Sequence, residues 1–182
     1  MNELTIVMYH YVRPIKGSQF PGIKGLELEG FKRQLDYLES NYSIVSSEEV
    51  IDAILNNKSL PPNACWLTFD DGYKDHYLYV LPELLRRNLS GGFFPPRVAI
   101  QDSKMLDVNS VHHILSCANE IKDLVVDLNS QSVLHGLGVD QIRSHYEEFG
   151  VANRFDSADT VYVKRMLQHV LPEEVRNSIT ST

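Results

Sequence analysis

Short apolar runs alternate with helical patterns through the first hundred residues. Four runs rich in β-forming residues are predicted to be strands, at about 4–9, 42–45, 64–69 and 91–95. Helices are predicted between them, over about 29–40, 46–55 and from Pro82 onward. Strands that alternate with helices in this way favour a parallel α/β sheet or barrel.

Two of these helices carry clear local signals. Phe31, Leu35 and Leu38 recur at helical spacing and give the first helix an apolar face. Ser46 and Glu49 form a capping box at the start of the second, because each side chain can bond the backbone N–H of the other residue.

The pattern changes after about residue 100. Asn109 is predicted to cap a helix, 121–128 fits neither period well, and 139–149 and 159–180 have helical patterns. This second half is predicted to be a helical segment that is either inserted in the α/β unit or appended to it.

The charge of the chain restricts its partners. The 182 residues carry a formal net charge of −7, Arg86-Arg87 is the only Arg-Arg pair, and no run of Lys or Arg is longer than two residues. Nucleic acid and anionic membranes select clustered Lys and Arg, so neither is expected as a partner.

Cysteines and the N-terminus add two further expectations. Cys65 and Cys117 are far apart and fit no CxxC metal or redox spacing. Met1 to Leu4 contains no basic segment and begins no long apolar run, so no signal peptide is visible and the location is expected to be cytoplasmic.

The third predicted strand ends in two adjacent carboxylates and a glycine, Asp70-Asp71-Gly72. Paired acids repel each other unless a cation or a proton offsets the charge. A metal ligand beside a general base needs such a pair. The alternative is that the acids cap the N-terminus of the next helix.

Four segments carry a resemblance to a known family. Leu67 to Tyr73 (LTFDDGY) resembles the first signature of the NodB-like polysaccharide deacetylases, the fourth family of carbohydrate esterases. Met8 to Val12, Pro82 to Leu85 and Phe93 to Pro95 resemble, in order, the family's first strand, the helix after the acid pair and the next strand. The resemblance extends over residues 4–98.

The resemblance implies a fold, a cofactor and an activity. The fold is a partial (β/α) barrel, here residues 1–100, followed by the helical segment 101–182. The cofactor is a divalent metal, often zinc, and the reaction removes acetyl groups from a polysaccharide or amino sugar. By match to the motif, Asp70 is the general base and Asp71 the metal ligand.

Two further residues are candidates for the site. If the sheet is parallel, His10 lies at the same edge as Asp70, where it could contact substrate or orient the acid. The alternative is an ordinary hydrogen-bonded histidine at a strand end. Tyr73 is a second substrate-contact candidate, with packing as the alternative.

The rest of the family's metal site has no match. Its second signature is a His, a Ser or Thr, two variable residues and another His, and no two of the seven histidines here are four apart. The later signatures are also absent. Asp71 is the only ligand carried over, and one carboxylate does not hold zinc. The metal is therefore expected in a complete enzyme and not in this chain.

Three hypotheses follow. The chain is the N-terminal part of a longer deacetylase, or a shortened, non-catalytic relative that binds carbohydrate or acts as a scaffold, or an unrelated α/β protein whose acids bind another cation. In the first two the partner is a carbohydrate. Half a barrel has unpaired edges, so self-association through an open sheet edge is also expected.

Three other histidines have simpler interpretations. His76 is predicted to lie on the surface of the helix after the motif. Side chains of adjacent helical residues point about 100° apart, so His112 and His113 are predicted to be ordinary helix positions rather than a ligand pair.

Overall fold

The computed structural model describes residues 3–180. The chain divides into two compact units, the first ending at Lys104 and the second beginning at Met105. Each unit is described by itself. Among the described residues, no helix is long and apolar enough to cross a membrane.

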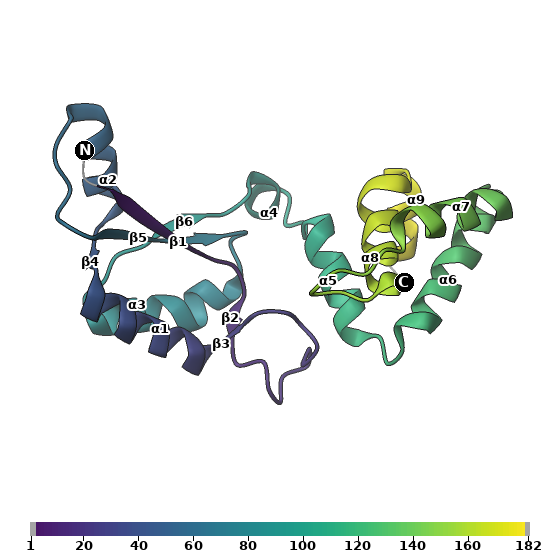
Figure 1. Ribbon diagram of the computed structural model, residues 1–182, viewed down its shortest axis with the longest axis horizontal. Helices are drawn as coiled ribbons and strands as arrows, with labels where there is room; N and C mark the ends of the chain where they lie inside the picture. The colour runs from purple at the N-terminus through teal and green to yellow at the C-terminus, as the bar shows by residue number, and fades with distance from the viewer. Residues whose placement is uncertain (1–2, 181–182) are drawn as a thin grey trace. The chain divides into compact units, whose positions relative to one another are not determined.

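The first unit is built on one parallel sheet (Figure 1). Its strands are β1 (Leu4–Tyr9), β4 (Ser43–Ile44), β5 (Ala64–Asp70) and β6 (Gly92–Phe94). β5 is central: β1 pairs with it along one edge, and β4 and then β6 pair with it along the other. All these pairings are parallel and the sheet is not closed, which confirms the predicted α/β class with a partial, open sheet.

Shorter elements complete this unit. A separate two-stranded parallel sheet, which the sequence did not predict, joins β2 (Val12–Arg13) to β3 (Leu26–Glu27). The helices are α1 (Leu28–Asn41), α2 (Ser47–Asn56), α3 (Leu81–Arg87) and α4 (Arg97–Gln101), with a π-helical turn, η1 (His76–Val80), leading directly into α3.

Two sequence signals explain where the helices lie. Phe31, Leu35 and Leu38 are the buried residues of α1, as their spacing predicts. Ser46 and Glu49 form the expected capping box at the start of α2.

The core of this unit lies on one face of the sheet. Cys65, Leu67 and Phe69 alternate along β5, and all three side chains are fully buried against α1 and α3. In Figure 1 these two helices lie side by side on that face. Phe69 stacks on Tyr9 of β1 and meets Phe31 of α1 edge to face. The apolar period of β5 therefore produces a layered helix-on-sheet core.

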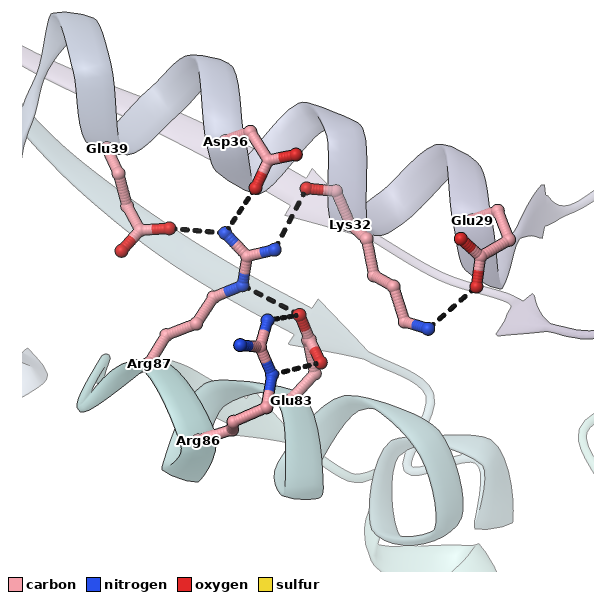
Figure 2. Close-up of polar contacts among 7 residues, drawn as sticks. All are labelled: Glu29, Lys32, Asp36, Glu39, Glu83, Arg86 and Arg87. Carbon is pink, nitrogen blue, oxygen red and sulfur yellow. Dashed lines mark hydrogen bonds and ion pairs between the residues drawn. The ribbon is translucent and has the colours of Figure 1, made fainter.

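An ion-pair network fastens α3 to α1 (Figure 2). Arg87 of α3 reaches Asp36 at 2.7 Å and also bonds Glu39, both on α1. Glu83, which is buried, accepts hydrogen bonds from Arg86 at 2.6 Å and from Arg87 at 2.7 Å. These bonds, the one from Arg86 first, lower the pKa of Glu83 to about 2. Glu83 is therefore ionised at neutral pH.

The second unit is helical, as its sequence pattern predicts. It contains α5 (Asp107–Cys117), α6 (Ile121–Leu134), α7 (Val139–Phe149), α8 (Ala158–Arg165), a π-helical turn η2 (Met166–Val170) and α9 (Glu173–Thr180). Its core is centred on Tyr162, Val163 and Met166, packed with Leu128 of α6.

Three details of the helix predictions were wrong. The helix predicted from Pro82 already begins, as the π-helical turn, at His76. Asn109 lies inside α5 and is buried, so it is not the cap; the cap position is Leu106. The helix predicted over 159–180 is interrupted after η2, because Pro172 has no backbone N–H to continue it.

Candidate functional site

The acid pair lies where β5 ends. Asp70 is the last residue of the strand, and Asp71 and Gly72 both turn into the left-handed region, with φ of 68° and 62°. A Cβ on Gly72 would lie 2.6 Å from the Cβ of Pro95, so the close approach of the chain after β6 also requires glycine here. The turn thus presents the two carboxylates at the end of a rigid strand.

Neighbouring strands bring other residues to the same edge. The register pairs Tyr9 with Phe69 and Phe94 with Asp70. His10, the next residue after Tyr9, therefore comes level with Asp70 on one side, and Phe94 lies beside it on the other. The carboxyl ends of parallel strands are where α/β folds bind ligands.

Asp71 has two close neighbours. The hydroxyl of Tyr73 donates a hydrogen bond to its Oδ2 at 2.6 Å, and Nδ1 of His10 lies 4.0 Å from the same oxygen. Burial, with a smaller contribution from the bond to Asp71, raises the pKa of Tyr73. The phenol therefore stays protonated and acts as the donor. The structure brings His10, Asp71 and Tyr73 together, whereas their predicted roles stay predictions.

His76 is buried, with an exposed fraction of 4%, so its prediction as a surface residue was wrong. It lies on the same side of the helical turn as Val80 and Leu84, which are also buried. Nε2 of its ring lies 2.8 Å from the backbone carbonyl of His10. Burial lowers the pKa of His76. A histidine that the sequence placed in solvent thus lies beneath the site.

Two more contacts join the segment after β1 to the segment after β5. The rings of Tyr11 and Tyr73 stack with centroids 4.1 Å apart. Arg13 forms an ion pair with Asp75, whose side chain is 9% exposed. The sequence analysis singled out neither Arg13 nor Asp75. Both segments are therefore fixed to each other at the edge that carries the acids.

The residues at this edge do not form a zinc site. No group of three or more His, Cys, Asp or Glu that could hold a metal ion occurs in the described part of the chain. Asp71 and His10 are two donors at most, and zinc sites use three or four protein ligands. The metal that the family resemblance implies therefore does not fit the residues gathered here.

Comparison with known proteins gives matches among solved structures alone. No protein-family model matches the sequence, and no curated protein matches it. A de-N-acetylase from Aggregatibacter actinomycetemcomitans matches 50% of this chain at 28% identity and a TM-score of 0.43. IcaB from Ammonifex degensii matches 63% of this chain at 22% identity and a TM-score of 0.44. The deacetylase PplD from Streptococcus pyogenes, in complex with acetate, matches 60% of this chain at 18% identity and a TM-score of 0.38.

The matches to these deacetylases therefore extend over half to two-thirds of this chain. Of the chains in the three solved structures, the same matches cover 37%, 52% and 63%, in the order given above. The chain thus spans roughly a third to two-thirds of the length of the structures it matches.

Proposed function

We propose that this chain contributes the acid pair of a polysaccharide deacetylase, an enzyme that removes acetyl groups from a polysaccharide or amino sugar. Asp70 is the proposed general base and Asp71 the proposed metal-binding carboxylate. One observation carries the proposal: the two acids lie at the end of a central parallel strand, and His10, which directly follows the neighbouring strand β1, lies 4.0 Å from Asp71. The motif LTFDDGY supports the choice of reaction.

The local chemistry is consistent with two different roles for the acids. Tyr73 donates a hydrogen bond to Asp71, which holds the carboxylate in one orientation. Asp70 is partly exposed at the strand end, where a carboxylate can accept a proton from a water molecule. The described residues supply too few metal donors, so the proposal requires ligands beyond those gathered at this edge.

A second candidate is a non-catalytic relative that binds carbohydrate. The observation that favours it is an exposed aromatic ring beside the acids: Phe94, which pairs with Asp70 at the end of β6, is 50% exposed. Aromatic rings offer broad apolar surfaces for ligands that combine apolar and polar groups. Such binding needs no metal.

Zinc titration of this chain tests the metal part of the proposal. Because Asp71 and His10 are too few ligands, we expect calorimetry at neutral pH to show no specific site tighter than about 1 μM. A tight, stoichiometric site that Asp71→Asn abolishes would contradict this expectation and show that further ligands come together in solution.

Acetate release tests the function. In the longest natural protein that contains this chain, loaded with zinc and given an N-acetylated oligosaccharide, we expect Asp70→Asn to lower turnover by roughly 10²- to 10⁴-fold with little change in bound metal. Asp71→Asn should reduce the bound metal instead. Asp140→Asn is the matched control, because the Asp140 side chain is 96% exposed on α7 in the other unit.

Three outcomes separate the candidates. Acetate release that depends on Asp70 supports the deacetylase. Absence of release, with oligosaccharide binding that Phe94→Ala weakens, overturns the deacetylase and supports the carbohydrate-binding relative. Absence of both overturns the two candidates together.

A further inference from the structure

We propose that His76 is a positioning residue that holds His10 beside Asp71. Its importance for catalysis rests on the proposed function, whereas the geometry does not. The hydrogen bond from His76 joins the segment that follows β1 to the segment that follows β5, and these two segments carry His10 and Asp71 respectively.

The hydrogen bond has a defined direction. A backbone carbonyl only accepts, so Nε2 of His76 must carry the proton that it donates to the oxygen of His10. Nδ1 of His76 is buried and has no hydrogen-bond partner among the described residues. The ring is therefore the neutral Nε2–H tautomer, and its single proton is committed to His10.

The ring of His76 is also held in place. It lies against Phe69 and Tyr73, each with centroids 5.5 Å away, and against Phe93 at 6.0 Å. Its backbone N–H bonds the carbonyl of Tyr73 at 3.0 Å, which closes the turn after the acid pair. A side chain with this packing has few alternative rotamers, so the position of its donor is fixed.

His10 depends on such support because it lies outside the strand ladder. β1 ends at Tyr9, and the side chain of His10 is half exposed. The bond from His76 is the contact that fixes the carbonyl of His10, while the Tyr11–Tyr73 stack and the Arg13–Asp75 pair hold residues further along. Removing this one bond is therefore expected to free His10 without separating the two segments.

The experiment measures whether His10 senses Asp71. Asp71→Asn should shift the NMR signals of the His10 ring in the otherwise unchanged chain, because Nδ1 lies 4.0 Å from the carboxylate. In a His76→Phe background, which keeps a ring in the apolar surroundings but removes the donor, we expect this response to be lost. In a His76→Gln background, which restores an N–H donor, we expect it to return.

Controls separate positioning from general damage. His169→Phe, at an exposed position of the other unit, should leave the response of His10 to Asp71→Asn unchanged. His76→Met is a second variant without a donor, for use if the phenylalanine variant does not fold. A response that persists in a folded variant without a donor, or that fails to return in folded His76→Gln, overturns the proposal.

The NMR measurements do not depend on enzymatic activity, so the positioning role of His76 and the proposed function can be contradicted independently of each other. Where acetate release is measurable, His76→Phe should lower turnover and His76→Gln should recover part of it. Should the protein release no acetate, the proposed function falls, while the NMR response still decides whether His76 holds His10.

Discussion

The two faces of the first unit's sheet are covered very differently. On one face, Cys65, Leu67 and Phe69 have no exposed surface, because α1 and α3 pack directly on them. On the other, Ile6 and Met8 of β1 remain 55% and 60% exposed. Both faces are built from the same strands by the same alternation of side chains.

The difference arises because helices cover one face of the sheet but only the beginning of the other. α2 covers the beginning of the second face, where Val50 packs with Ala64 and Trp66. No comparable layer among the unit's described elements covers Ile6, Met8 and Phe94 further along. The covered face holds the unit together, and the open face leads to the edge that carries Asp70. Stability thus depends on the covered face, whereas the site draws on both faces, because His76 packs against Phe69 of the covered one.

Phe69→Ala should produce the largest loss of stability. Phe69 is fully buried between β1, α1 and β6, and removing such a ring costs about 3–5 kcal/mol of unfolding free energy. Trp66 is the single tryptophan and lies in β5, so its fluorescence during urea unfolding follows this unit. Phe94→Ala on the open face is the matched control, and an equal loss there would contradict the contrast between the faces.

Glu83→Gln should have an intermediate effect. It removes the negative charge of the carboxylate that pairs with both Arg86 and Arg87 (Figure 2). This loss should lower the free energy of unfolding by on the order of 2–3 kcal/mol. Because the folded pKa is lowered to about 2, the stabilisation is complete above the unfolded pKa of about 4.3 and is lost as pH falls toward 2.

The measurement for Glu83 is therefore unfolding between pH 2 and 7. The variant should lose less stability than the parent chain as the pH is lowered through this window. Glu29→Gln is the control, since the Glu29 side chain is 70% exposed in its pair with Lys32. An unchanged pH profile in Glu83→Gln would show that the charge of Glu83 contributes nothing to stability.

Met8→Ala should have the smallest effect, within about 0.5 kcal/mol, because the side chain is already largely in water. The open edge of β1 is still expected to recruit a second copy of the chain. In that case light scattering will show association, and the cost of Met8→Ala will rise with protein concentration. A monodisperse monomer would contradict self-association and leave the small effect as the result.

Strong local patterns predicted most of the first unit. The apolar run from Ala64 and the spacing of Phe31, Leu35 and Leu38 located β5 and α1, because burial of these residues determines both elements. The acid pair was predicted at a strand end, where the structure places it. These features depend on residues close together in the chain.

What the sequence did not provide depends on contacts between distant segments. The bond from His76 to His10 and the pair of Arg13 with Asp75 join residues more than 60 positions apart. One signal was available for His76: Val80 and Leu84 follow it at steps of four, which places all three on one helical face. Because proline favours the first turn of a helix, Pro82 was predicted to start this helix, whereas the helical turn begins earlier, at His76.

The left-handed backbone of Asp71 limits how this site can change during evolution. Most side chains are strained at a φ of 68°, whereas asparagine, aspartate and glycine adopt it readily. Exchange of the carboxylate for an amide or for no side chain therefore leaves the turn intact, while other exchanges add a backbone penalty of about 1 kcal/mol or more. A lineage can thus abandon the acid and keep the fold, so descendants with Asn or Gly at this position would mark the loss of the acid's chemistry rather than the loss of the protein.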